Sequence, residues 1–134
     1  MADADQMFTL VEHFATSFNP TRMAFDHSLN HLMNDDSALI HVVMFENGVV
    51  GYCLAFDHYA FYANGRVTWV EEIMVRKDLR GKGIGNDLMK SVEQWAVSRK
   101  SKLIGLATRR ASLFYKAIGY EDSAIFFRKM IEER

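Results

Sequence analysis

Three glycines at alternate positions, Gly81, Gly83 and Gly85, separate a strand-like segment from a helical one. The preceding segment, Val67 to Val75, is rich in β-branched and aromatic residues, which is typical of a strand. After the glycines, apolar residues recur at the spacing of an amphipathic helix, from about Gly83 to Ser98. The sequence therefore predicts a strand, a glycine-rich loop and a helix in direct succession.

Such a loop can bind an anion. Glycines let backbone N–H groups point into one concavity without obstruction by Cβ atoms, and the helix that follows adds its N-terminal donors. Arg80 and Lys82 add two cations, which favours a phosphate or a diphosphate. The alternative is a turn that needs glycine conformations and carries ordinary surface charge.

Two familiar phosphate-binding motifs do not fit. The dinucleotide fingerprint needs a glycine at the sixth position counted from Gly81, and Asn86 stands there. The nucleoside-triphosphate loop needs a Gly-Lys-Ser or Gly-Lys-Thr ending, which the chain does not contain.

The segment resembles the motif of the GNAT superfamily of acetyl-CoA-dependent N-acetyltransferases. That motif reads Arg or Gln, any two residues, Gly, any residue, Gly or Ala, and it follows a strand that ends in an aliphatic residue five positions earlier. The matching residues are Val75, Arg80, Gly83 and Gly85. The similarity extends upstream through Trp69 to Glu72 and downstream to the segment Phe114 to Tyr120, and together these stretches span about half of the chain.

Length and composition indicate a single domain, residues 1–134, that is large enough to bury a core. The formal net charge of -1 argues against a dominant nucleic-acid or anionic-membrane surface. No apolar run approaches the length of a membrane span, and the start has neither a basic segment nor an apolar signal core. We therefore expect a cytoplasmic protein without nucleic-acid or membrane partners.

The order of elements resembles the GNAT fold, an α/β (α+β) domain with a mixed, mostly antiparallel sheet flanked by helices. The expected helices are Asp5 to Phe18, Thr21 to Met33, Gly83 to Ser98 and Arg110 to Ile118. The expected strands are Ala38 to Phe45, Val49 to Tyr59, Leu103 to Ala107 and Ala124 to Met130. A second hairpin is expected to join Tyr59 to Tyr62 with the strand Arg66 to Val75.

The expected order lacks the family's usual first strand, because residues 1–5 leave no room for one before the first helix. Either the start is truncated, or the exposed sheet edge is covered by another element, for which a partner subunit is one option. Family members are often dimers, so a homodimer stays open.

The resemblance implies that acetyl-CoA is the cosubstrate. Its pantetheine arm would pair with backbone groups of the strand before the loop, and its diphosphate would lie on the amides of the loop. The implied binding residues are Ile73, Met74, Val75, Arg80, Gly81, Lys82, Gly83, Ile84, Gly85, Asn86 and Thr108. Thr108 departs from the family, where many members carry asparagine, and a threonine can replace only part of that hydrogen-bonding capacity.

The same resemblance implies two catalytic residues. Tyr115 matches the tyrosine that protonates the departing thiolate, and a phenol with a pKa of about 10 can donate at neutral pH. The alternative for Tyr115 is simple packing. Glu71 matches an acidic position that deprotonates or anchors the substrate ammonium, with Glu72 as the reserve candidate, and the alternative is a solvated charge. Neighbouring strand residues point to opposite faces, so only one of the two glutamates is expected to enter the cleft.

No metal site is expected. His27 and His31 lie four residues apart on a predicted helix, but no third ligand accompanies them. Cys53 lies in an apolar run and is expected to be a small buried hydrophobic residue rather than a nucleophile.

The predicted function is transfer of acetyl from acetyl-CoA to a primary amine, and a small polyamine or amino compound is the first choice of acceptor. Acidic and aromatic residues in the first interhelical loop and the second hairpin would suit a cation. These residues are Phe18, Asp57, Tyr59, Phe61 and Tyr62. The alternatives are acetylation of a protein lysine or N-terminus, and a non-catalytic acyl-CoA-binding regulatory module.

Overall fold

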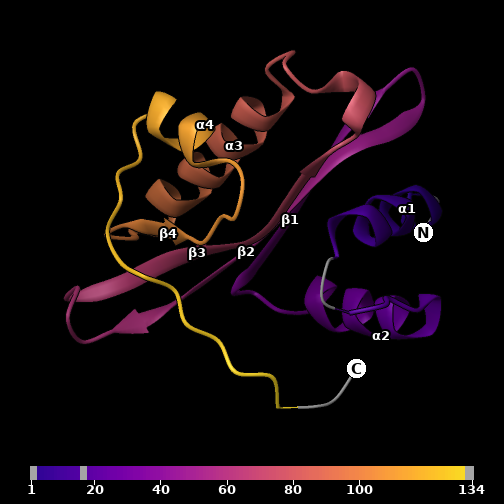
Figure 1. Cartoon of the computed structure of the whole chain (residues 1–134). Coiled ribbons are helices and arrows are strands. Elements are labelled where there is room, and N and C mark those ends of the chain that lie inside the picture. Colours follow the sequence, from indigo (N-terminus) through magenta and orange to yellow (C-terminus); the bar gives the residue numbers. More distant parts are fainter. Residues whose placement is uncertain (1–2, 16–17, 132–134) are drawn as a thin grey trace.

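The computed structural model describes residues 3–15 and 18–131. Figure 1 shows a twisted sheet with helices on both faces. The helices are α1 (Ala4–Phe14), α2 (Arg22–Met33), a short 3-10 helix η1 (Lys77–Leu79), α3 (Ile84–Ser98) and α4 (Ser112–Ala117). The strands are β1 (Ala38–Phe45), β2 (Gly48–Ala60), β3 (Gly65–Val75) and β4 (Ile104–Leu106).

The four strands form one sheet in the order β1-β2-β3-β4. The first three are antiparallel neighbours joined by hairpins, and β4 runs parallel to β3. A parallel neighbour requires a crossover connection, which α3 supplies. The predicted fold class, a mixed and mostly antiparallel sheet flanked by helices, is confirmed. The first element within the described residues is α1.

Each face of the sheet has its own apolar core. Helices α3 and α4 cover the larger one, which contains Cys53, Val70, Leu88, Met89 and Tyr115. Helix α1 covers the smaller one, which contains Met7, Leu10, Val49 and Tyr52, with Met74 packed against it. Cys53 is fully buried, as expected, and burial raises the pKa of its thiol. In the part of the chain that the structure describes, no helix is long and apolar enough to span a bilayer.

Two predicted elements differ from the structure. The first helix was expected to run to Phe18, but α1 ends at Phe14 and the backbone is already extended at Ala15; the predicted end included residues 16–17, which lie outside the described residues. The expected strand Ala124 to Met130 does not form. Its residues favour strands, but the segment passes over the sheet instead of pairing along one of its edges (Figure 1). There Phe126 stacks on Trp69, with 6.2 Å between the ring centroids.

A buried ion pair joins β2 to the end of α3. The Asp57 carboxylate is inaccessible to solvent and accepts two hydrogen bonds from Arg99, one of them 3.0 Å long from the terminal nitrogen Nη2. Arg66 lies 3.7 Å from the same carboxylate. The Arg99 guanidinium also lies over the Trp95 ring, 5.0 Å from its centroid. Asp57 is therefore committed to holding the sheet against α3, and the expectation that it binds a cationic substrate is wrong.

Replacing Asp57 with alanine should lower the free energy of unfolding by about 3 kcal/mol, because two arginines would lose their buried counterion. Urea denaturation measures this change. The matched control is Asp78→Ala, since Asp78 pairs with Arg76 on the surface and the loss of an exposed pair should change stability little. Equal effects of the two substitutions would contradict a structural role for Asp57.

Candidate active site

Strands β3 and β4 pair over only three residues. The parallel register joins Thr68 to Ile104 and ends at Val70 and Leu106. Beyond that point β3 continues to Val75, still paired on its other edge with β2 down to Gly51. The edge of β3 that faces β4 is therefore unpaired over its last five residues. This segment contains Ile73, Met74 and Val75, the three strand residues predicted to bind the cofactor.

A β-bulge lies at the start of this unpaired segment. Leu54 pairs with Glu72 and Ala55 pairs with Val70, so Glu71 is skipped by the ladder. The simple alternation of side chains is interrupted here, so the rule behind the prediction that the two glutamates point to opposite faces does not apply at this position. Glu71 is exposed, with its Oε2 atom 3.5 Å from the indole nitrogen of Trp69.

Glu72 occupies a different environment from Glu71. Its side chain is half-buried and accepts a hydrogen bond of 2.7 Å from the Tyr52 hydroxyl. Burial raises the pKa of Glu72, the Tyr52 hydrogen bond lowers it, and the nearby charge of Glu71 raises it further, so that the net shift is upward. Burial and the same contact raise the pKa of Tyr52, which keeps its hydroxyl protonated as the donor.

The glycine loop ends at an uncapped helix. Gly81 and Gly83 have φ angles of 80° and 87°, and a Cβ atom at either position would meet nothing within 4 Å. Gly83 precedes α3 without a side-chain cap, and the first intrahelical bond of α3 is donated by Asp87 to the Gly83 carbonyl. The amides of Ile84, Gly85 and Asn86 are thus among the free donors of a helix N-terminus. The open space at Gly81 and Gly83, next to these donors, leaves room for a phosphate group.

The remaining loop residues have distinct surroundings. Gly85 permits close packing, because a Cβ atom there would lie 3.3 Å from the Phe114 ring of α4. Ile84 packs against the larger core. The Arg80 side chain folds back and donates from Nε to the Val75 carbonyl at 3.1 Å, whereas Lys82 is exposed. Arg80 therefore holds the loop on the end of β3 in this structure.

Tyr115 lies in the larger core with only 6% of its surface exposed. Its ring packs edge-on against Phe114 and Tyr120, at centroid distances of 5.0 and 6.0 Å. Every fully buried polar side-chain atom in the described residues has a hydrogen-bond partner. The Tyr115 hydroxyl has no such partner among these residues, so its oxygen is not fully buried and reaches open space. Burial raises the pKa of Tyr115, which keeps the phenol neutral and able to donate a proton.

The spacing between Tyr115 and Gly119 has a structural reason. Gly119 ends α4 in the left-handed conformation, and the amide of Tyr120 then bonds the Tyr115 carbonyl at 2.9 Å. This turn brings the Tyr120 ring onto Tyr115, and the Tyr120 hydroxyl donates to Glu93 of α3 at 2.8 Å. The Tyr115 ring is thereby fixed between two helices.

Thr108 lies in the exposed loop between β4 and α4. Its hydroxyl oxygen accepts a hydrogen bond of 3.0 Å from the amide of Ala111. That bond orders the loop ahead of α4, and the hydroxyl hydrogen remains available as a donor. A contact between Thr108 and the cofactor stays a prediction.

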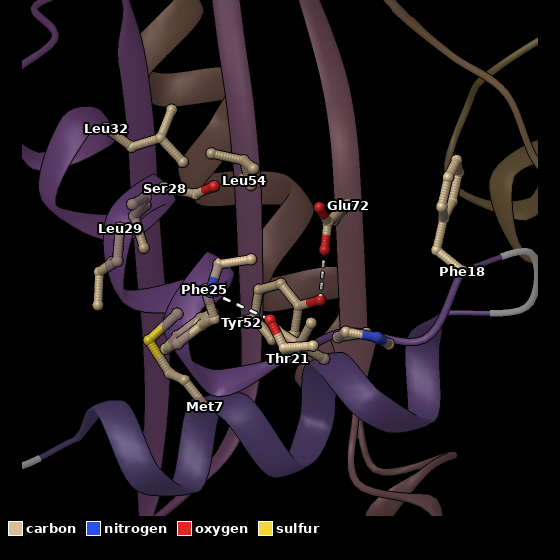
Figure 2. A pocket seen from close by; sticks show the side chains of 14 residues that line it. Met7, Phe18, Thr21, Phe25, Ser28, Leu29, Leu32, Tyr52, Leu54 and Glu72 are labelled. Atoms are coloured by element: carbon tan, nitrogen blue, oxygen red, sulfur yellow. Dashed lines mark hydrogen bonds between the residues drawn. The ribbon is translucent and has the colours of Figure 1, made fainter. Parts of the chain in front are cut away.

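A cavity of about 280 Å³ lies on the face of the sheet opposite to α3, between α1, α2 and the first three strands. Figure 2 shows Glu72 and Tyr52 at its floor, with α2 side chains on the other wall. Most of its lining is apolar, including Met7, Val11, Phe25, Leu29, Leu32 and Leu54. Glu72 lines this cavity and Glu71 does not.

The residues expected from the sequence to meet the acceptor coincide only in part with this cavity. Of the five residues expected to meet the acceptor, Phe18 lines it, whereas Tyr59, Phe61 and Tyr62 are largely exposed on the second hairpin. Tyr52 was missed. Its approach to Glu72 follows from the strand register, which pairs Tyr52 with the neighbouring Met74, and no sequence motif marks that register.

Within the described residues no group of three or more potential ligands is arranged to hold a metal ion.

Comparison with known proteins places this geometry in a family. The model of the Acetyltransferase (GNAT) family matches residues 4–120. Thialysine N-epsilon-acetyltransferase from Bos taurus is 36% identical over 78 residues, which are 55% of this chain and 45% of that protein. The matched segment thus spans less than half of the length of this relative.

Solved structures share the fold. Glucosamine-6-phosphate N-acetyltransferase from Arabidopsis thaliana superposes with a TM-score of 0.86 at 19% identity, covering 98% of this chain and 93% of that one. The aminoglycoside N-acetyltransferase AAC(6′)-Iy in complex with CoA gives a TM-score of 0.81 at 18% identity, covering 96% and 89%. With the family match over most of its length, the chain belongs to the Acetyltransferase (GNAT) family.

Proposed function

We propose that the protein transfers acetyl from acetyl-CoA to the primary amine of a small molecule. One observation supports the proposal: β3 separates from β4 at a point where the cavity that contains Glu72 lies on one face of the sheet and the core that contains Tyr115 lies on the other. A thioester placed in that gap would have a proton acceptor on one side and a proton donor on the other. The similarity to an enzyme named for acetylating the ε-nitrogen of thialysine also favours an amine acceptor.

The backbone around the gap supplies the cofactor contacts in this proposal. The unpaired edge of β3, through Ile73, Met74 and Val75, would bind the pantetheine arm, and the free amides of the loop from Gly81 to Asn86 would bind the diphosphate. Acetyl-CoA supplies the activated acetyl group. These donors are fixed by the fold before binding, so little reorganisation is needed.

Glu72 would act on the amine. An alkylammonium must lose a proton before its nitrogen can attack, and a carboxylate with a raised pKa is a better acceptor than an ordinary one. Glu72 lines the cavity, whereas Glu71, the first candidate from the sequence, lies outside it beside Trp69. We therefore assign the proton-accepting role to Glu72 and keep Glu71 as the alternative that mutation decides.

Tyr115 would act on the leaving thiolate. Breaking the thioester C–S bond leaves a thiolate that needs a proton, and the neutral phenol of Tyr115 can donate it. The rings of Phe114 and Tyr120 hold this phenol in place, which favours a directed proton transfer over one from bulk water.

Titration of the protein with acetyl-CoA, followed by thiol release in the presence of primary amines, tests the function. We expect binding and amine-dependent release, and Tyr115→Phe should lower kcat by about 100-fold or more while the Kd for CoA changes little. Unchanged turnover in Tyr115→Phe would contradict its role as the acid. Binding without release for every amine, peptides with a free lysine or N-terminus included, would indicate a non-catalytic module.

Glu72→Gln should lower kcat/KM for the amine by about 100-fold or more, whereas Glu71→Gln should have a small effect. In the wild type, kcat/KM should rise with pH as Glu72 loses its proton, with a midpoint above the ordinary value of 4.5, because burial raises this pKa. Glu72→Gln should remove that rise. A large loss in Glu71→Gln alone would instead assign the base to Glu71.

Gly83→Val should weaken CoA binding by about tenfold or more, since the new side chain would occupy the open space at Gly83, directly before the free amides of α3. The matched control is Lys100→Val, which places the same β-branched residue in a left-handed conformation at the other end of α3, where φ is 61°. Isothermal titration measures affinity, and circular dichroism verifies folding. Equal CoA affinity in folded Gly83→Val and wild type would overturn the assignment of the loop.

A further inference from the structure

We infer that the acceptor is a small amine with one cationic end and an apolar body, not a polyamine. This inference rests on the proposed function, because it takes the Glu72 cavity as the acceptor site. It deepens that proposal by assigning the chemical class of the acceptor. It also departs from the polyamine that the sequence favoured, since the acidic and aromatic hairpin residues behind that preference do not line the cavity.

Glu72 provides a place for one ammonium group. Its Oε1 atom is occupied by the Tyr52 hydroxyl, and no cationic side chain among the described residues lies within 4 Å of the carboxylate. Every fully buried polar side-chain atom in those residues has a hydrogen-bond partner. The Oε2 atom of Glu72 has none among them, so it is not fully buried and faces accessible space. A half-buried carboxylate that lacks a counterion is matched by a ligand that brings one.

The described lining of the cavity contains no second carboxylate to pair with another cation. Glu72 is the one charged residue among the fourteen described residues that line it. The Thr21 hydroxyl oxygen already accepts the Ala24 amide at 3.2 Å, and the Tyr52 hydroxyl is committed to Glu72 (Figure 2). Ser28 is left as a neutral polar group on the α2 wall. A second ammonium placed there would lose its hydration without gaining a counterion.

An apolar body gains from the same walls. Leucine and methionine side chains from both helices and the strands line the cavity, whose volume of about 280 Å³ accommodates a short alkyl or aryl chain. Each methylene moved from water into such surroundings should raise affinity by about fourfold. The cavity therefore selects for a chain that is apolar beyond its amine.

The test compares hexylamine with 1,6-diaminohexane, which differ only by the second amine. Thiol release gives kcat/KM, and isothermal titration without acetyl-CoA gives the Kd of each compound. We expect hexylamine to exceed the diamine by about tenfold or more in both measurements, and butylamine to fall below hexylamine. A diamine that binds and reacts as well as hexylamine, or better, would overturn the inference.

Two further arms separate the contributions of charge and apolar surface. Hexan-1-ol should bind more weakly than hexylamine to the wild type, and Glu72→Gln should make the two affinities nearly equal. Leu32→Glu adds a carboxylate on the half-buried α2 wall and should shift the preference toward the diamine. An unchanged preference for hexylamine over hexan-1-ol in folded Glu72→Gln would contradict the assigned anchor.

The two proposals fail in different ways. If amines are acetylated but the diamine is preferred, the acceptor class is wrong and the proposed function stands. If hexylamine binds with the expected preference but no amine releases thiol, the cavity is assigned correctly and the proposed function is wrong. If neither compound binds or reacts while another amine does, the inference about the cavity is overturned.

Discussion

The incomplete pairing of β3 is the constraint on which the rest of the site depends. One edge of β3 is fully used by β2, whereas the other edge is used by β4 for only three residues. Backbone groups that a neighbouring strand would normally pair with are thus left without a strand partner, and the Val75 carbonyl is bonded by the Arg80 side chain instead. The glycine loop and the uncapped start of α3 follow directly after this segment, so both sets of free backbone groups lie along one continuous stretch of chain.

The two faces of the sheet supply different chemistry. Tyr115 belongs to the core under α3 and α4, and its ring is fixed by the turn at Gly119. Glu72 belongs to the cavity under α1 and α2, and the bulge at Glu71 alters the alternation of side chains next to it. The proposed proton acceptor, Glu72, and the proposed proton donor, Tyr115, therefore lie on opposite faces of the sheet.

Features that depend on neighbouring residues could be predicted from the sequence, whereas features that depend on contacts between distant segments could not. The glycine loop, the strand before it and the spacing of Tyr115 from Gly119 each depend on neighbouring residues, and the structure contains all of them. The environment of Glu72 depends on a bulge and on the register with β2, which brings Tyr52 to it from a distant segment. The failed strand after α4 has the same cause, since strand propensity does not specify a pairing partner.

Hydrogen–deuterium exchange tests the central claim most directly. The account predicts that acetyl-CoA slows amide exchange in two segments, Glu71 to Val75 and Gly81 to Asn86, because the cofactor occupies their free backbone groups. Exchange in β1, which lies at the far edge of the sheet, should be unaffected. Saturating acetyl-CoA that leaves both segments unprotected, or that protects β1 instead, would contradict the claim that the parted strands and the glycine loop form the cofactor site.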